Sequence, residues 1–282
     1  MSDSSSRWVD VDDGRLYVEV AGQGQPILLI HGWALDHRMF TPQVEALSDR
    51  FSVITFDRRG FGKSEAPPDL RLELDDIDRI LDAVGVPSVH LLGMSQGGRI
   101  ALRYAATRPQ RIRSLLLQGA VVDGVDIPEH DNDSVPVAEY ARFAKGGKLA
   151  EVVEHWLQHP MMWLGDNHES ERRLLQTIMG DYSGSDLINY DEDSYAFDSD
   201  VLGALANFPR PTLLLTGARE TQTRRLHADA LKQRLPCCSE VILEKSGHLS
   251  NLTEPLVFNQ AVFDFCTGVD EEAPLSGGGT LD

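Results

Sequence analysis

The chain has 282 residues, of which 41% are hydrophobic and 25% charged. That length allows one large domain or two small ones with a sizeable buried core. The 44 acidic and 26 basic side chains give a formal charge of −18. A surface this negative repels phosphate groups, so we expect neither nucleic acid nor an anionic membrane as a partner.

Cysteine usage and the first residues both indicate a reduced setting inside the cell. Cys237 and Cys238 are adjacent, which makes a mutual bridge strained, and Cys266 lies near the end of the chain. No CxxC spacing indicates a zinc ribbon or a redox pair. Residues 1–10 lack the basic and apolar regions of a signal peptide, and no window approaches the roughly 18 apolar residues that cross a bilayer. We expect a cytoplasmic protein without a membrane segment.

Apolar runs alternate with amphipathic segments along most of the chain. Residues 8–20 alternate as two short strands around Asp12-Asp13-Gly14, a typical hairpin turn. Later runs are apolar throughout, as in strands that are buried on both faces of a parallel sheet. The predicted buried strands are 26–30, 52–56, 89–93, 114–117, 212–215 and 241–243, and the predicted helices are 41–48, 72–84, 96–107, 224–234 and 254–266. This alternation predicts an α/β fold with a mostly parallel, open sheet flanked by helices.

The alternation stops between residues 123 and 207, where no convincing strand is found. The helical patterns of this stretch are 136–146, 148–158 and 168–179. We therefore predict an α/β core built from residues 1–122 and 208–267, with an inserted helical cap at 123–207. Residues 268–282 are acidic, rich in glycine and poor in apolar side chains, which predicts a flexible tail.

The segment Gly93-Met94-Ser95-Gln96-Gly97 follows a predicted buried strand and precedes a predicted helix. This is the setting of a nucleophile elbow, G-x-S-x-G. The glycines allow the strand and the helix to approach closely around a strained turn. The serine hydroxyl then projects above the sheet beside a helix N-terminus, which favours developing negative charge. Ser95 is the predicted nucleophile.

A serine hydroxyl needs a base to become a good nucleophile. His248 follows the last predicted strand at the same end of the sheet as Ser95, and the chain order of serine, acid and histidine favours it over the earlier histidines. The acid that orients the imidazole is expected in the loop after the preceding strand, where Glu220 is the only carboxylate. Asp123, after the strand at 114–117, is the alternative acid, because either loop can reach His248.

Two backbone N–H groups are needed to stabilise an oxyanion. One is the amide of Gln96, which directly follows the nucleophile. The other is expected in the turn His31-Gly32-Trp33, after the strand at 26–30, where the glycine allows the Trp33 amide to point at the substrate. The predicted oxyanion hole therefore consists of the amides of Trp33 and Gln96.

The predicted cap contains bulky apolar side chains that can line a substrate pocket. The candidates are Trp156, Met161 and Trp163, which can equally form the core of the cap itself. His155 and His159 are four residues apart on a helical pattern, but they have no third ligand nearby and no HExxH glutamate. We therefore expect no metal, and the proposed chemistry requires no cofactor.

Together these pieces resemble the α/β-hydrolase superfamily over residues 8–122 and 207–266. The matching pieces are His31-Gly32-Trp33, the motif DRRGFGKS at 57–64, the elbow around Ser95, the loop at 217–220 and Gly247-His248. They are most similar to the esterases, enol-lactonases and cofactor-free haloperoxidases of that superfamily, which implies the same fold with a cap in the insertion.

The chain departs from the family pattern at two places. Glu220 stands where the family usually has aspartate, which keeps Asp123 open as the acid, and the segment between Ser64 and Leu72 is shorter than in relatives. The DRRGFGKS motif at 57–64 is interpreted as structural, with the Asp57 carboxylate organising the loop beneath the site.

The main hypothesis is a serine hydrolase that cleaves a small-molecule carboxylic ester or lactone through an acyl-enzyme. One alternative keeps the fold and changes the chemistry to C–C bond hydrolysis, peracid formation or cofactor-free dioxygenation, with Asp123 as the working acid in the last case. Another is a ligand-binding sensor with little turnover. A homodimer is compatible with the sequence, which specifies no oligomeric state.

Overall fold

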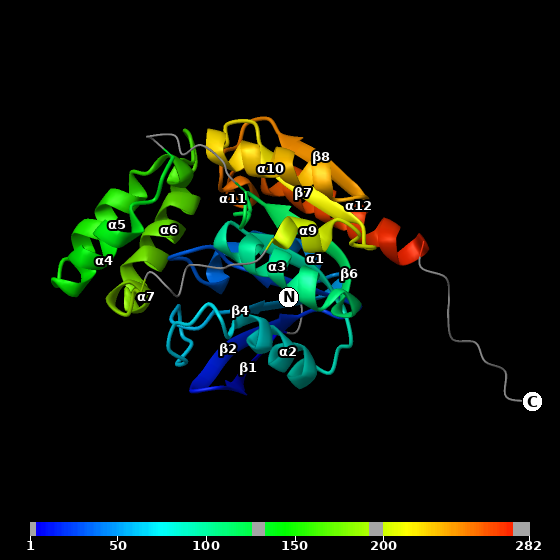
Figure 1. Ribbon diagram of the computed structural model, residues 1–282, viewed down its shortest axis with the longest axis horizontal. Helices are drawn as coiled ribbons and strands as arrows, with labels where there is room; N and C mark the ends of the chain where they lie inside the picture. The colour runs from blue at the N-terminus through cyan, green and yellow to red at the C-terminus, as the bar shows by residue number, and fades with distance from the viewer. Residues whose placement is uncertain (1–3, 126–132, 192–199, 273–282) are drawn as a thin grey trace, which may run out of the picture.

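The computed structural model describes residues 4–125, 133–191 and 200–272. Its centre is an eight-stranded sheet in the order β1-β2-β4-β3-β5-β6-β7-β8 (Figure 1). The strands are β1 (Ser4–Val11), β2 (Gly14–Ala21), β3 (Gln25–Ile30), β4 (Phe51–Phe56), β5 (Val89–Met94), β6 (Ile112–Gln118), β7 (Thr212–Gly217) and β8 (Cys238–Leu243). The β1 and β2 hairpin pairs antiparallel with β4, and every later pairing is parallel. The predicted α/β fold with a mostly parallel, open sheet is confirmed.

The inner strands are largely buried because helices cover both faces of the sheet. β5 and β7 are buried at every residue, as their unbroken apolar runs predict. β8 differs, because it is the last strand of the sheet and only Leu243 of its residues is buried. The prediction of a buried strand at 241–243 was wrong at Ile242, which is 43% exposed.

The helices form two layers on opposite faces of the sheet (Figure 1). α1 (Thr41–Leu47), α11 (Ser250–Thr253) and α12 (Pro255–Glu272) contact one another and contribute to one apolar core. The other layer is α2 (Glu73–Val84), α3 (Gln96–Thr107), α9 (Val201–Leu205) and α10 (Gln222–Arg234), which share a second apolar core. Two separate cores on one sheet are what a doubly covered sheet requires.

A group of helices lies to one side of the sheet in Figure 1 and forms the cap. Its helices are α4 (Val137–Lys145), α5 (Leu149–Leu157), α6 (Glu169–Asp181) and α7 (Ser185–Ile188). The described part of the insert, 133–191, contains no strand. α9 falls within the range expected for the cap, yet it packs against α3 and α10 in the second core. Residues 126–132 and 192–199, also in that range, lie outside the described residues.

The C-terminal helix is longer than the sequence pattern predicts. α12 continues to Glu272, past Gly268 where the tail was expected to begin, and residues 273–282 lie outside the described residues. Within the described chain, no helix has the combination of length and apolarity that crossing a bilayer requires.

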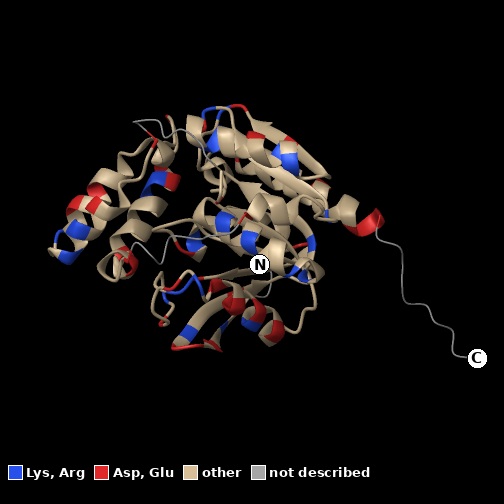
Figure 2. Cartoon of the chain, in the orientation of Figure 1, with Lys and Arg blue, Asp and Glu red and all other residues tan. Residues whose placement is uncertain are grey.

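Acidic and basic residues are interspersed around α2 (Figure 2), and several of the carboxylates there bond arginines. Asp76 is buried and receives two hydrogen bonds from the Arg59 guanidinium, at 2.7 Å each. Arg108 bridges Asp75 and Asp78 at 2.5 Å, between α2 and the end of α3. These pairs balance each other within the formal count, so the net charge of −18 comes from the acidic side chains in excess of the basic ones.

Candidate active site

Ser95 lies in the sharp turn between β5 and α3. Its backbone has φ 54° and ψ −114°, a conformation that is unfavourable for any residue with a side chain. The turn is held on both sides, because the Ser95 N–H donates to the Gln118 carbonyl at 2.8 Å and the Val121 N–H donates to the Ser95 carbonyl at 3.3 Å. The geometry is that of a nucleophile elbow, with a strained serine at a helix N-terminus.

Two glycines allow this turn. A Cβ atom at Gly93 would lie 2.4 Å from the carbonyl oxygen of Gly97, and one at Gly97 would lie 2.3 Å from the carbonyl oxygen of Ile30. Both distances are far below van der Waals contact. The first turn of α3 can pack onto β3 and β5 only because neither position carries a side chain.

His248 and Glu220 form a buried pair. Nδ1 of His248 lies 2.8 Å from Oε2 of Glu220, and the two residues are 3% and 4% exposed. The other carboxylate oxygen accepts the Thr221 N–H at 2.8 Å. Burial acts to raise the pKa of Glu220, but the charge of His248 and its hydrogen bond outweigh burial, so the pKa is lowered and the carboxylate is ionised. Because a carboxylate only accepts, it fixes the ring hydrogen on Nδ1 and leaves Nε2 as the basic atom.

Asp123 has a different partner. Its Oδ1 lies 2.7 Å from Nε and 2.5 Å from Nη2 of Arg99, on the next helix turn after the nucleophile. Of the two acids that the sequence leaves open, the structure brings Glu220 to the imidazole.

Gly119 provides the space that the His248 ring occupies. It has φ +54°, and a Cβ atom there would lie 2.6 Å from both Cε1 and Nδ1 of His248 and 2.8 Å from Oε2 of Glu220. Sequence reasoning missed this residue, although a glycine directly after a buried strand is a signal that could have found it.

The Trp33 amide is on a turn that packs against the nucleophile, and the Gln96 amide directly follows the nucleophile in the chain. A Cβ atom at Gly32 would be 3.4 Å from the Ser95 Cβ, so the turn that carries Trp33 passes directly against Ser95. Among the backbone hydrogen bonds that the described residues form in turns, loops and caps, none has the Trp33 or Gln96 N–H as its donor. Both residues also line the cavity that Ser95 and His248 share. This arrangement suits two donors for a developing oxyanion.

The Trp33 side chain joins this turn to the cap. Its Nε1–H donates to Oδ2 of Asp186 at 2.6 Å, and the Tyr182 hydroxyl donates to Oδ1 at 2.5 Å. Burial raises the pKa of Asp186, against the effect of these two hydrogen bonds. The indole ring also packs on Tyr140 and Trp156 of the cap. Asp186 lies 153 residues from Trp33, and no sequence pattern signals the contact.

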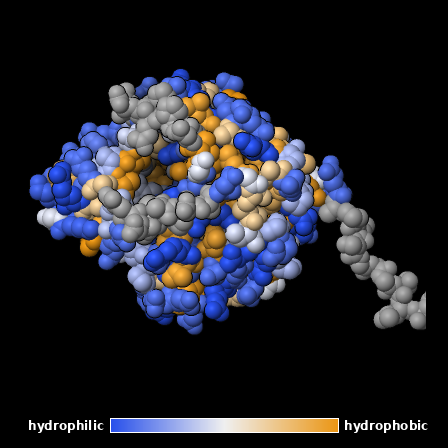
Figure 3. Space-filling model, viewed as in Figure 1, coloured by the Kyte–Doolittle hydropathy of each residue, from blue (hydrophilic) through white to orange (hydrophobic). Residues whose placement is uncertain are grey.

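A cavity of about 150 Å³ opens at Ser95. Its lining is mostly apolar, and Figure 3 shows hydrophobic residues gathered around a hollow between the cap and the core. The lining residues are Trp33, Leu35, Met94, Ser95, Gln96, Arg99, Val121, Val135, Val137, Trp156, Met161, Met162, Arg224 and His248. A small, mostly apolar cavity with a few convergent polar groups is typical of a ligand site.

The cap residues expected at the substrate divide into two groups. Trp156 and Met161 line the cavity, together with Met162. Trp163 does not line it: the ring is 36% exposed and lies beneath the Arg219 guanidinium, 5.0 Å from the ring centroid. The sequence does not separate the two groups, because Met161, Met162 and Trp163 are consecutive apolar residues in and directly after a short 3-10 helix at 160–162.

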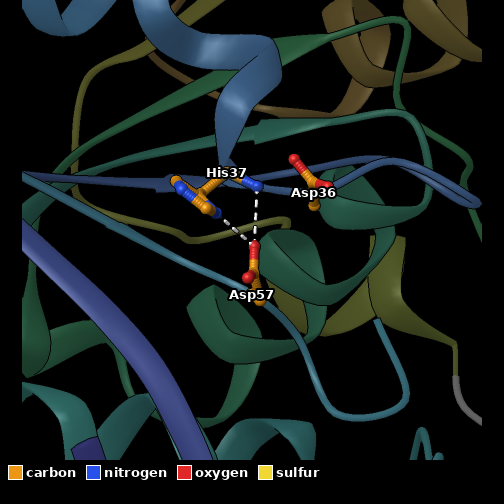
Figure 4. A group of neighbouring side chains, drawn as sticks. All are labelled: Asp36, His37 and Asp57. Atoms are coloured by element: carbon orange, nitrogen blue, oxygen red, sulfur yellow. Dashed lines mark hydrogen bonds and ion pairs between the residues drawn. The ribbon is translucent and has the colours of Figure 1, made fainter. Parts of the chain in front are cut away.

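A second histidine near the site, His37, is also bonded to a carboxylate (Figure 4). Its Nδ1 lies 2.6 Å from Oδ1 of Asp57, and its backbone N–H donates to the same oxygen at 2.8 Å. Oδ2 of Asp57 accepts the Lys63 N–H at 2.8 Å. Asp36 could complete a metal-binding triplet by its position, but both of its carboxylate oxygens accept N–H groups of Arg38. Hydrogen bonds within the chain engage all three side chains, and the Asp57 carboxylate ties the loop at 57–64 to His37 as the structural interpretation predicts.

Arg58 of that motif is hydrogen-bonded to Gln96, the residue after the nucleophile. Arg58 is 1% exposed, and its Nε and Nη2 donate to the two carboxylate oxygens of Glu73 at 3.0 and 2.7 Å. Nη1 donates to the side-chain oxygen of Gln96 at 2.9 Å. The burial of this ion pair raises the pKa of Glu73, although the charge of Arg58 opposes the shift.

The Nδ1 atoms of His155 and His159 have different hydrogen-bond partners within the chain. Nδ1 of His155 pairs with the Tyr140 hydroxyl at 2.5 Å, and Nδ1 of His159 accepts the Met161 N–H at 3.2 Å.

Comparison with known proteins places this geometry in a family. The model of the alpha/beta hydrolase fold matches residues 25–255. YisY of Bacillus subtilis, an AB hydrolase superfamily protein, is 40% identical over 261 residues, which are 89% of this chain and 94% of that protein. The 3-oxoadipate enol-lactonase 1 of Acinetobacter baylyi is 25% identical and covers 86% of this chain and 89% of its own length.

The structure of the enol-lactonase from Burkholderia xenovorans LB400 superposes with a TM-score of 0.77 at 25% identity, over 93% of this chain and 100% of that one. The matched segment contains the whole sheet from β3 to β8, the elbow and the loops that carry Glu220 and His248. With sheet order, elbow and sequence in agreement, the chain belongs to the α/β-hydrolase fold family.

Proposed function

We propose that the protein is a serine hydrolase that cleaves carboxylic esters or lactones through an acyl-enzyme. The observation that carries the proposal is the pair of His248 and Glu220, joined by a 2.8 Å hydrogen bond and opening onto the same small cavity as the strained Ser95. This is the set of groups that nucleophilic acyl transfer needs: a nucleophile, a base and a carboxylate that orients the base.

In the first half of the reaction Ser95 Oγ attacks the carbonyl carbon while His248 Nε2 takes the hydroxyl proton. The carbonyl oxygen becomes negative and is stabilised by the amides of Trp33 and Gln96. Glu220 stabilises the imidazolium without taking a proton itself. His248 then gives its proton to the leaving alkoxide, the C–O bond breaks, and the acyl group remains on Ser95.

In the second half a water molecule repeats the attack on the acyl-enzyme. His248 takes a proton from the water and returns one to Ser95 Oγ as the acid is released. With a lactone the alcohol formed in the first half stays attached to the acyl group, and one hydroxy acid leaves. The enol-lactonase names of two relatives support this substrate class for the chain.

The test is turnover of p-nitrophenyl butyrate by the wild type and by Ser95→Ala. We expect kcat to fall by about 10⁵-fold, since removing a nucleophile of this type costs on the order of 10⁶ in related chemistry. The matched control is Ser183→Ala, on an exposed turn of the cap, which should keep wild-type turnover. A fluorophosphonate probe should label the wild type and not Ser95→Ala. Undiminished turnover in Ser95→Ala would contradict the proposal.

Cofactor-free dioxygenation with Asp123 as the acid has less support. Asp123 is bonded to Arg99, so its carboxylate is engaged away from the imidazole.

A further inference from the structure

Arg224 is a charged residue in the wall of an otherwise mostly apolar cavity. It lies in the first turn of α10, and its side chain lines the cavity together with Ser95 and His248. Nη1 donates to Nδ1 of His227 at 2.8 Å. Nε is buried and has no hydrogen-bond partner in the described part of the chain. The guanidinium is always protonated and Arg224 lines the cavity, so a ligand with acceptor oxygens can bond it from the cavity side.

In the described part of the chain, the guanidinium of Arg224 is not paired with a carboxylate. The other arginine of the cavity wall, Arg99, is paired with Asp123 at 2.5 Å. Glu220 is near Arg224 but is bonded to His248, and Oδ2 of Asp133 accepts a backbone N–H at 3.0 Å. Among residues 4–125, 133–191 and 200–272, no carboxylate forms an ion pair with the Arg224 guanidinium.

The remaining neighbour, His227, supplies no negative charge. Burial and the charge of Arg224 lower the pKa of His227 to about 3, so its ring is neutral. Burial also lowers the pKa of Arg224, although the charges of Glu220 and Asp133 oppose the shift. The cavity therefore presents a partly buried guanidinium that has no ion-pair partner among the described residues, and guanidinium groups bind carboxylates through two parallel hydrogen bonds.

We propose that Arg224 binds a carboxylate of the substrate, so that the esters or lactones turned over carry a free carboxylate a few atoms from the scissile carbonyl. This inference rests on the proposed function, because it takes the reacting carbonyl to lie at Ser95. The cavity of about 150 Å³ is of the size that holds a benzene molecule. Only a few carbon atoms can therefore separate a carbonyl at Ser95 from an acid at Arg224.

The other walls fit such a molecule. Trp156, Met161 and Met162 present apolar surface to the chain between the two polar ends. The formal charge of −18 repels anions at long range, but that repulsion is screened beyond about 8 Å at physiological salt. Selection of an anionic substrate therefore depends on the local charge at Arg224.

The test compares two esters that differ only at the chain end: mono-p-nitrophenyl glutarate, with a terminal carboxylate, and p-nitrophenyl pentanoate, with a terminal methyl group. We expect the wild type to have the higher kcat/KM for the glutarate ester, after subtraction of its uncatalysed hydrolysis. In Arg224→Gln the ratio of the two kcat/KM values should fall by about 10- to 100-fold, as expected for one charge-assisted hydrogen-bonded pair. Arg225→Gln, on the exposed neighbouring position, removes the same charge and should keep the wild-type ratio.

A wild-type preference for the pentanoate ester would overturn the inference, even if Arg224→Gln failed to fold. An unchanged ratio in a folded Arg224→Gln would overturn it as well.

A binding measurement separates this inference from the proposed function. Calorimetry with glutarate on Ser95→Ala should show binding that the double variant Ser95→Ala, Arg224→Gln loses. If neither ester is turned over but glutarate binds in this way, the proposed function fails and the carboxylate site stands. If both esters are turned over through Ser95 without the preference, and glutarate does not bind, the site fails and the proposed function stands.

Discussion

Two histidines of this protein are bonded through Nδ1 to a buried carboxylate, and their surroundings differ. His248 meets Glu220 at 2.8 Å, and His37 meets Asp57 at 2.6 Å. The His248 pair opens onto the cavity that contains Ser95. The His37 pair is enclosed, with its Nε2 3.5 Å from a further carboxylate, that of Glu19. The two pairs therefore differ in their access to the cavity, and we expect only the His248 pair to take part in the proposed reaction.

The largest expected difference between the two pairs is in turnover. His248→Ala removes the proposed base and should lower kcat for p-nitrophenyl butyrate by about 10⁵-fold, since loss of a triad histidine costs nearly as much as loss of the whole triad. His37→Ala should keep kcat within a few-fold of the wild type. The measurement is steady-state turnover with circular dichroism to check folding. Equal losses in the two variants would remove the distinction between the pairs.

The next effect separates the two candidate acids. Glu220→Gln keeps the size of the side chain but removes its charge, so the imidazolium loses its stabilising partner and the preferred tautomer changes. We expect kcat to fall by about 10⁴-fold, as for the same change in other triads. Asp123→Asn is the matched control and should lower kcat by less than about 10-fold, because Asp123 contacts Arg99. The reverse order would make Asp123 the working acid.

A smaller effect is expected on stability, and from the enclosed pair. His37→Ala leaves Asp57 buried without its imidazole partner and should lower the free energy of unfolding by about 3 kcal/mol. His168→Ala, a control at a partly exposed residue of the cap, should change it by less than about 0.5 kcal/mol. Urea unfolding of the three proteins is the measurement. A His37→Ala protein as stable as the wild type would show that the pair is not needed for the fold.

The smallest effect is a pH dependence of stability. Burial disfavours the charged ring, but the hydrogen bond and charge of Asp57 outweigh it and raise the pKa of His37 above its ordinary value of 6.5. The unfolded chain therefore loses this proton first as pH rises. The stabilisation is complete below pH 6.5 and is lost as pH increases through the raised pKa of the folded state.

Other buried histidines act in a different pH range. The pKa of His31 is lowered to about 4 and that of His227 to about 3, mainly by burial, so both affect stability below pH 6.5. The decline above pH 6.5 should be present in urea unfolding of the wild type and absent in His37→Ala. A decline of the same slope in both proteins would assign it to another group.

The sheet was predictable because its inner strands are buried on both faces and therefore consist largely of apolar residues. The elbow was predictable because the spacing of Gly93, Ser95 and Gly97 can be read from the sequence without knowing which residues they contact. The order of β1, β2 and β4 and the exposure of Ile242 on β8 depend on which strand lies at an edge, which no local pattern records. α9 is too short to show the periodic spacing of apolar residues that marks a helix, so neither the helix nor its packing on α3 was predicted.

The site divides in the same way. Ser95, His248, Trp33 and Gln96 each stand at the end of a predicted strand, and the parallel sheet brings those ends together. The acid was left open because two loops can reach the imidazole. Asp186 was missed because its hydrogen-bond partner Trp33 is far away in sequence. Arg224 was missed because a sequence does not show that the described residues leave one of its N–H groups without a partner. Trp163 is exposed outside the cavity lining, which the sequence did not reveal because hydropathy does not tell which residues next to a turn face the cavity.

The hydrogen bond between Trp33 and Asp186 has a kinetic consequence. The same residue offers its amide to the proposed oxyanion and its indole to the cap at 2.6 Å. A movement that lifts α7 away from the core to let product out must break this bond or displace the Trp33 turn with it. The rate of product release and the stabilisation of the transition state are then linked through one side chain. A change that loosens the cap should therefore speed product release and weaken the stabilisation of the transition state.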